Sequence, residues 1–333
     1  MKTAVLGAGS WGMTLAVHLQ RVGHGVRLWE IDPTRAGRLQ AERVDRVILP
    51  GLTLPPPIEV SSDLAQVLGG VGAVVFVVPS HHMRSSARRA ALSWPGGAFA
   101  VNAAKGLEEG SLRRMDEVLA EELPKGTSLG VLSGPSHAEE VAELHPTALV
   151  AAAREKAEAA RIQDLFHGDP LRIYTSSDLV GVGLGGSLKN VIALAAGVLD
   201  GLGLGDNTKA ALMTRGLHEI TRLGVALGAA PETFAGLAGM GDLFVTCMSR
   251  HSRNRLLGEK IGKGLTLEAA LGQMVMVAEG VKTARAARDL AHGVRVEVPI
   301  VEQVCRVLFE GVPAREAVRA LMARDAKPET GEP

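Results

Sequence analysis

The chain has 333 residues, carries 36 basic and 36 acidic side chains, and is 46% hydrophobic. Its length fits two domains better than a single core. A net charge of zero provides no overall field for nucleic acid or an anionic membrane, and no apolar stretch is long enough to cross a bilayer, so we expect neither partner. Two cysteines, Cys247 and Cys305, are too few for a disulfide framework, which favours a reducing cytoplasm.

The N-terminal segment has the pattern of a dinucleotide-binding turn. An apolar strand over residues 3–6 runs into Gly7, Gly9 and Gly12, and a helical pattern follows. With this spacing the first glycine permits a tight turn, the second lets the backbone approach a pyrophosphate, and the third lets the helix pack on the strand. A glycine-rich turn without a ligand is the alternative. The residues predicted to bind the cofactor here are Gly7, Gly9, Ser10, Trp11 and Gly12.

The second predicted strand, Gly25–Trp29, bears on the choice of cofactor. It ends in Glu30, about 20 residues after the glycine turn, where an acidic residue contacts the adenosine ribose. A carboxylate there repels a 2′-phosphate. Arg35, in a predicted loop after Asp32, is long enough to reach over such a phosphate. The cofactor is therefore NAD or NADP, with NADH favoured about tenfold in kcat/KM.

Three further apolar runs are typical of buried parallel strands. They are Val71–Val78, Ala98–Val101 and Leu129–Leu132. Each ends in a small polar cluster, and because ligands of an open α/β sheet lie at the carboxyl ends of its strands, we expect these clusters to converge near the cofactor. Two later strands, near 147–151 and 171–174, are predicted to extend the sheet.

The second half of the chain is predicted to be helical. After about Ser176 the helical patterns follow one another without a convincing strand. They cover residues 187–199, 209–227, 279–291, 300–308 and 315–323. The fold class is therefore α/β, with an N-terminal Rossmann-type doubly wound sheet (1–178), an all-helical C-terminal domain (179–326) and a flexible tail (327–333). A pocket between such domains is the expected active site.

Nine short motifs, in order, resemble the NAD(P)-dependent glycerol-3-phosphate dehydrogenases of bacterial type. They are Gly7–Gly12, Val78–Ser80, Ala104–Gly106, Ser133–Ser136, Gly186–Asn190, Gly239–Leu243, Thr246–Cys247, Ser252–Asn254 and Val277–Gly280. The resemblance implies reversible hydride transfer between sn-glycerol 3-phosphate and dihydroxyacetone phosphate, a small phosphorylated C3 substrate, for glycerophospholipid synthesis. It also implies a cytoplasmic homodimer. Two positions depart from the family: His137 replaces a frequent Phe, and Glu30 replaces a frequent small residue.

Lys189 is the predicted catalytic residue. Oxidising a secondary alcohol needs a base for the hydroxyl proton, and the reverse reaction needs the same group as an acid. Lys189 lies at the head of a long apolar helical pattern, where burial and the charges of Lys105 and Arg253 are expected to lower its pKa. A lysine that extends from the helix start to solvent is the alternative. The resemblance places the family's base at this position.

The other substrate contacts follow from the resemblance. It implies that Lys105 contacts substrate and cofactor, and that Asp242 binds substrate hydroxyls and orients Lys189. Asn190 and Thr246 complete this network, with Gly134 and Ser136 contributing from the first domain. Without the resemblance, Lys105 is most simply a surface lysine and Asp242 a helix N-cap.

The phosphate site is predicted at the start of a helix. The planar fork of arginine suits a phosphate monoester, and the resemblance maps that site onto Ser252, Arg253 and Asn254. A helix cap beside a surface arginine is the alternative. The remaining predicted cofactor contacts are Lys105, Ala138, Arg253, Val277 and Glu279, of which Glu279 alternatively serves as a helix-starting acid.

No metal is expected, because His81 and His82 are adjacent rather than spaced along one helix face. Two other functions remain open. One is a different dehydrogenase with the same domain plan, of the β-hydroxyacid or ketopantoate type, against which Arg253 and Lys105 favour a phosphorylated substrate. The other is a non-catalytic module that senses the dinucleotide, which has no need of Lys189.

Overall fold

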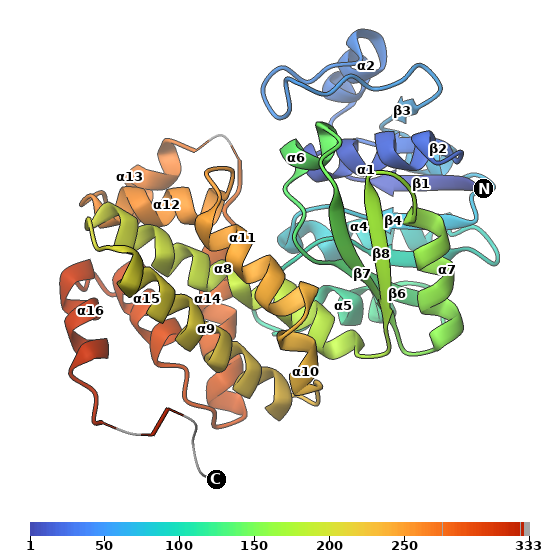
Figure 1. Ribbon diagram of the computed structural model, residues 1–333. Coiled ribbons are helices and arrows are strands. Elements are labelled where there is room, and N and C mark those ends of the chain that lie inside the picture. The colour runs from blue at the N-terminus through green and yellow to red at the C-terminus, as the bar shows by residue number, and fades with distance from the viewer. Residues whose placement is uncertain (275, 327, 330–333) are drawn as a thin grey trace.

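The computed structural model describes residues 1–274, 276–326 and 328–329. It has two lobes, an α/β lobe with the N-terminus and a helical lobe with the C-terminus (Figure 1). The predicted tail lies largely outside the described residues, since only 328 and 329 of it are described.

The first lobe is built on one eight-stranded sheet in the order β3-β2-β1-β4-β5-β6-β7-β8. The strands are β1 (Lys2–Leu6), β2 (Gly25–Trp29), β3 (Glu59–Ser61), β4 (Ala73–Phe76), β5 (Phe99–Asn102), β6 (Leu129–Ser133), β7 (Thr147–Ala153) and β8 (Leu171–Ser176). All neighbours are parallel except β6 and β7. The strand order reverses beside β1, which places a ligand crevice at the β1/β4 switch point. The predicted doubly wound class is confirmed, while the three-residue β3 was not predicted.

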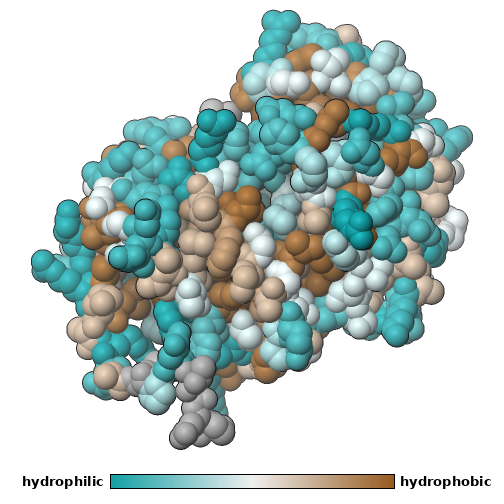
Figure 2. Space-filling model, in the orientation of Figure 1, coloured by the Kyte–Doolittle hydropathy of each residue, from teal (hydrophilic) through white to brown (hydrophobic). Residues whose placement is uncertain are grey.

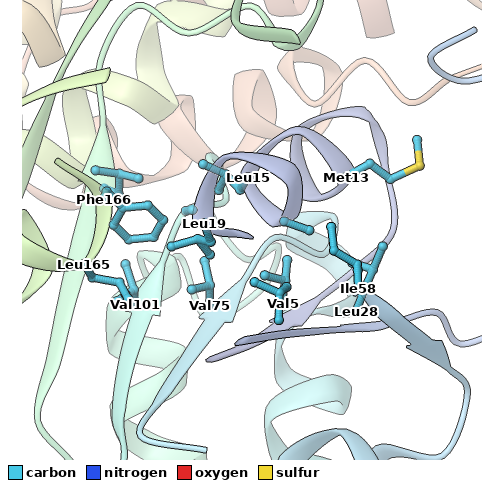
Figure 3. Close-up of a cluster of buried hydrophobic side chains, with 14 of the residues drawn as sticks. Val5, Met13, Leu15, Leu19, Leu28, Ile58, Val75, Val101, Leu165 and Phe166 are labelled. Carbon is cyan, nitrogen blue, oxygen red and sulfur yellow. The ribbon is translucent and has the colours of Figure 1, made fainter. Parts of the chain in front are cut away.

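Helices cover both faces of this sheet. They are α1 (Ser10–Arg21), α2 (Pro33–Glu42), α3 (Leu64–Leu68), α4 (Ser80–Ala91), α5 (Met115–Glu122), α6 (Ala138–Ala142) and α7 (Lys156–Phe166). Because strand side chains alternate between faces, Val5 packs with one cluster and its neighbour Leu6 with the other. Figure 3 shows Val5 and Val75 beneath Leu19 of α1. Burying each such side chain stabilises the fold by roughly 1.5–3 kcal/mol.

The regular elements of the second lobe are all helices among its described residues. It contains α8 (Leu179–Gly201), α9 (Asp206–Ala226), α10 (Pro231–Phe234), the π-helical turn η1 (Leu237–Gly241), α11 (Asp242–Met248), α12 (Arg253–Gly262), α13 (Leu267–Gly272), α14 (Gly280–Gly293), α15 (Pro299–Phe309) and α16 (Ala314–Met322). Helix α8 is central and packs against α9, α11, α12 and α14. A Cβ on Gly197 or Gly258 would overlap the backbone of the facing helix, so glycine permits the close approach of α8 and α12.

Helix α8 corrects two expectations. It begins at Leu179 rather than Ser187, because the Asp178 carboxylate caps it by accepting a hydrogen bond from the Gly181 N–H at 2.8 Å. Lys189 therefore lies in the middle of the helix and not at its head. At 23 residues, α8 is also long and apolar enough to cross a membrane, but 83% of its most apolar window is buried within the protein, as in the core helix of a soluble domain.

Candidate active site

A cleft lies between the two lobes, at the carboxyl ends of the strands. It has a volume of about 500 Å³, within the roughly 300–1,000 Å³ that is typical of a small-molecule or cofactor site. The three predicted polar clusters meet here, through Pro79, Lys105 and Ser136. Lys189 and Arg253 line the cleft from the helical lobe.

The glycine turn fits a dinucleotide pyrophosphate. Gly7 has φ +113°, a conformation that favours glycine, and a Cβ on Gly12 would overlap the Gly7 carbonyl oxygen. Gly9 precedes α1 without a side-chain cap, and a Cβ added to it would meet no atom within 4 Å. The open side of the turn and the first-turn N–H groups at Ser10 and Trp11, which both line the cleft, form the cradle that a pyrophosphate needs.

At the end of β2, Arg35 is held by acidic groups, which corrects the prediction of a mobile loop arginine. Arg35 lies in α2, a helix that Asp32 caps by accepting from the Thr34 N–H. Its guanidinium pairs with Glu30 and with Asp45, at 2.8 Å, and donates to the Ala8 carbonyl oxygen at 2.6 Å. The Arg35 side chain is 18% exposed and that of Glu30 is 8% exposed, so both are fixed in place.

Asp45 was not predicted from the sequence, because it comes from a loop that reaches this site only in the folded chain. Its Oδ1 accepts hydrogen bonds from the N–H groups of Val47 and Ile48. Burial raises the pKa of Asp45, but these bonds and the contact with Arg35 outweigh burial, so the pKa lies below its ordinary value. Asp45 is therefore a stable carboxylate partner for Arg35.

The centre of the site contains two lysines that share one carboxylate. Lys189 pairs with Asp242 and donates a hydrogen bond to the Thr246 hydroxyl at 2.6 Å. Lys105, from the other lobe, donates to the second Asp242 oxygen at 2.7 Å and to the Gly134 carbonyl at 2.9 Å. Asp242 is fully buried and the Lys189 side chain is 7% exposed. The predicted contact between Asp242 and Lys189 is therefore present, and the carboxylate is not the free helix cap of the alternative.

This arrangement tunes the acidity of Lys189. Its pKa is lowered to about 7: burial is the largest cause, the charge of Lys105 also lowers the pKa, and the charge of Asp242 raises it. The other predicted cation, Arg253, is exposed and is not among the main causes of this shift. An amine with a pKa near 7 both takes and gives a proton at neutral pH, as a general acid–base requires.

At the start of α12, the predicted phosphate residues have different roles in the structure. Ser252 caps the helix by accepting from the Arg255 N–H at 3.2 Å, which is the alternative considered for it. Asn254 accepts from the Gly280 N–H and donates to Asn190, both at 2.9 Å, so these amides join three helices. Arg253 lines the cleft and has no acidic partner within the described part of the chain.

The remaining predicted residues lie around the cleft or directly behind it. The Gly134 carbonyl accepts from Lys105 and from the Ser136 hydroxyl, the latter at 2.9 Å. The Glu279 carboxylate, at the start of α14, accepts from the Ser80 N–H at 3.2 Å and from its hydroxyl, and so joins the two lobes. Ala138 and Val277 also line the cleft.

Several cleft residues were not among the predicted contacts. They include Trp29, His82, His137 and His251. Two of these had a signal in the sequence: His82 lies in a polar cluster expected near the cofactor, and His137 departs from a family motif. Burial and the charges of Lys189 and Lys105 lower the pKa of His137 to about 4, so it is neutral at physiological pH. Across the described residues, no group of three or more His, Cys, Asp or Glu side chains has the arrangement of a metal site.

A Rossmann-type lobe joined to a helical lobe across a cleft of this kind is the architecture of two-domain dinucleotide-dependent dehydrogenases. The chain belongs to the NAD-dependent glycerol-3-phosphate dehydrogenase family. The family model for the N-terminus of these enzymes matches residues 2–159, and the model for their C-terminus matches residues 178–319.

Individual relatives agree with this assignment. A protein of Pelotomaculum thermopropionicum named glycerol-3-phosphate dehydrogenase (NAD(P)+) is 53% identical over 327 residues, which cover 97% of this chain and 93% of that protein. The crystal structure of a glycerol-3-phosphate dehydrogenase from Coxiella burnetii matches with a TM-score of 0.93 and 38% identity, over 97% of this chain and 99% of that one. A ketopantoate reductase of Ralstonia eutropha, at 17% identity and a TM-score of 0.60 over 97% of this chain and 100% of that one, shares the fold alone.

Proposed function

We propose that this protein is an NAD(P)-dependent dehydrogenase that interconverts dihydroxyacetone phosphate and sn-glycerol 3-phosphate. The observation that carries the proposal is Lys189, a buried amine with a pKa of about 7, in a cleft that also contains the glycine turn and Arg253, which has no acidic partner among the described residues. Relatives that align over nearly the whole chain bear the name of this activity. The family membership and the site chemistry therefore support the same reaction.

The proposed chemistry assigns the proton to Lys189. The cofactor supplies or accepts the hydride at its nicotinamide ring. In reduction, the Lys189 ammonium donates a proton to the ketone oxygen, and the charges of Lys189 and Lys105 stabilise the negative charge that develops there. In oxidation, neutral Lys189 removes the hydroxyl proton. Asp242 and Thr246 hold the amine in position.

The substrate phosphate is assigned to the start of α12. Arg253 offers a guanidinium fork that no carboxylate engages in the described part of the chain, and the N-terminal N–H groups of α12, near Ser252 and Asn254, add partial positive charge. The other proposed substrate contacts are Lys105, Gly134, Ser136, Asn190, Asp242 and Thr246. Ser136 lies in the cleft lining beside Lys105, whereas Gly134 and Asp242 act from behind it through the lysines that they hold.

The cofactor is assigned to the glycine turn and the residues that flank it. The pyrophosphate binds Gly7, Gly9, Ser10, Trp11 and Gly12. The nicotinamide side is completed by Lys105, Ala138, Arg253, Val277 and Glu279. At the adenosine end, Glu30 and Arg35 contact the ribose, and because the cluster of Glu30, Arg35 and Asp45 is net negative, NADH is favoured over NADPH.

The wider role follows from the same proposal. The enzyme is assigned to the cytoplasm and to the supply of glycerol 3-phosphate for glycerophospholipid synthesis. It is assigned as a homodimer, and exposed apolar side chains support this: Met240 of η1 and Phe244 and Met248 of α11 recur every four residues. Figure 2 shows hydrophobic residues gathered on this face, over α9 and α11. Light scattering of the purified protein tests the dimer.

A substrate panel tests the function. The purified protein is mixed with NADH or NADPH and with dihydroxyacetone phosphate, dihydroxyacetone, ketopantoate or a β-keto acid, and the loss of nicotinamide absorbance is recorded. We expect kcat/KM for dihydroxyacetone phosphate to be at least about a hundredfold higher than kcat/KM for any of the other compounds. A preference for ketopantoate or a keto acid would contradict the proposal. NADH binding without turnover of any compound would indicate a sensor instead.

A further inference from the structure

Asp45 holds Arg35 in a geometry that leaves the guanidinium little freedom. The Arg35 Nε and Nη2 atoms donate to Asp45 Oδ2 at 3.0 and 2.8 Å. Nη1 donates to Glu30, and Nη2 also donates to the Ala8 carbonyl oxygen at 2.6 Å. The guanidinium is therefore engaged on three sides by acceptors of the protein itself.

The position of Asp45 is fixed independently of Arg35. Its Oδ1 accepts hydrogen bonds from the Val47 and Ile48 N–H groups at 3.0 and 2.9 Å, which anchors the carboxylate to its own loop. Asp45 is 5% exposed and does not line the cleft, whereas Arg35 and Glu30 do. Asp45 can therefore influence a ligand in the cleft chiefly by holding Arg35 in position.

We infer that Asp45 is a specificity-determining residue, which selects NADH over NADPH by keeping Arg35 away from the position of a 2′-phosphate. The inference rests on the proposed function, because it assigns the cleft end beside Glu30 to the adenosine ribose. A 2′-phosphate carries nearly two negative charges. To bind it, Arg35 must leave Asp45 and Glu30, and these two buried carboxylates then remain near the phosphate without their counter-ion. This rearrangement weakens the binding of NADPH and does not affect the binding of NADH.

The Asp45→Asn variant separates the two functions of this carboxylate. The asparagine Oδ1 still accepts from Val47 and Ile48, so the loop retains its hydrogen bonds. The amide nitrogen replaces Oδ2 and presents donors to the Arg35 donors, so that contact is lost. A thermal melt of the variant, within about 3 °C of the parent, verifies the fold.

Binding of two cofactor fragments tests the inference without turnover. Calorimetry gives the Kd of 2′,5′-ADP, which carries the 2′-phosphate, and of 5′-ADP, which lacks it. In Asp45→Asn we expect the Kd of 2′,5′-ADP to fall about tenfold, while that of 5′-ADP changes less than about twofold. The double variant Asp45→Asn/Arg35→Ala is expected to lose this gain, because the effect acts through Arg35.

A matched control removes one carboxylate charge from a nearby aspartate. Asp32 is exposed, caps α2 and does not contact Arg35, so Asp32→Asn is expected to leave the ratio of the two Kd values within about twofold. An unchanged ratio in Asp45→Asn would overturn the inference. A gain in 2′,5′-ADP affinity that persists in the double variant without Arg35 would also overturn it, as would an equal gain in Asp32→Asn. Either result would mean that Asp45 acts only through its negative charge on the phosphate. Failure of the proposed reaction is seen separately, as absence of turnover with dihydroxyacetone phosphate in the parent protein.

Discussion

Two parts of the site contain ionic clusters of opposite composition. At the end of β2, two carboxylates, Glu30 and Asp45, share one cation, Arg35. At the centre of the site, two cations, Lys105 and Lys189, share one carboxylate, Asp242. The first cluster therefore has an excess of negative charge and the second an excess of positive charge. The same type of contact therefore has different consequences: the negative cluster repels a phosphate, whereas in the positive cluster the charge of Lys105 adds to burial in lowering the pKa of Lys189.

The largest expected effect comes from removing the amine at the centre. Lys189→Ala is expected to lower kcat by roughly 10²–10⁴, because the reaction loses its general acid–base, while NADH binding stays nearly intact. Steady-state kinetics and a fluorescence titration with NADH measure the two quantities. Lys156→Ala, at an exposed lysine on α7, is the control and should keep full activity. If Lys189→Ala retained more than about half of kcat, Lys189 would not be the catalytic group.

The second change removes the shared charge and sharpens the comparison. In Asp242→Asn the two lysines face each other without a counter-ion, and breaking such a buried pair costs roughly 3–5 kcal/mol of stability. Because the charge of Asp242 raises the pKa of Lys189, its loss should also move the pH profile to lower pH. Denaturant unfolding and pH–rate profiles measure both effects, with Asp206→Asn, at an exposed aspartate of α9, as the control. Wild-type stability together with an unshifted profile would contradict the shared-carboxylate account.

The parts of this site that could be predicted are those that depend on the spacing of residues close together in the sequence. The glycine turn is one example, because its spacing reflects backbone geometry within a few residues. The start of α8 was missed since its first turns are rich in glycine, which has low helix propensity. Those glycines are needed for packing: a Cβ on Gly185 would overlap the Ala238 carbonyl.

The partners of the predicted charges were harder to find. Asp45 and Asp242 reach Arg35 and Lys105 only through the folded chain, and the sequence contains no spacing that marks the Asp45 contact. The placement of Arg35 was predictable, however. Asp32 followed by Pro33 is a helix-start signal, and α2 does begin at Pro33, so a helical rather than a loop position for Arg35 was available from the sequence.

The third prediction concerns Arg253, the cleft cation that no carboxylate engages among the described residues. Arg253→Ala is expected to weaken kcat/KM for dihydroxyacetone phosphate by about 2 kcal/mol, which is the lower end for a charge-assisted contact because the guanidinium is exposed. Any residual activity on unphosphorylated dihydroxyacetone should be nearly unchanged. Arg250→Ala, at a neighbouring arginine outside the cleft, is the control. Equal losses on both compounds would mean that Arg253 has a structural role.

The smallest expected effect is at the negative cluster. The unmodified enzyme should prefer NADH by about tenfold in kcat/KM, or roughly 1.4 kcal/mol. Glu30→Ser removes one of the two carboxylates around Arg35 and should narrow this gap. Kinetics with both cofactors at fixed dihydroxyacetone phosphate measure it. An NADPH preference in the unmodified enzyme would show that Arg35 outweighs both carboxylates.

Burial and the charge of Lys105, opposed by Asp242, set the pKa of Lys189 near neutrality, and the pH dependence of the two reaction directions tests this most directly. Oxidation needs neutral Lys189, so its kcat/KM should rise through a pKa of about 7, whereas reduction needs the ammonium and should fall through the same value. Measurements above about pH 6.5 keep the substrate phosphate mostly dianionic. The two pH profiles are therefore predicted to change in opposite directions and to cross near pH 7. If kcat/KM for oxidation and for reduction changed only above about pH 9, Lys189 would have an ordinary lysine pKa. That result would contradict a Lys189 pKa near neutrality.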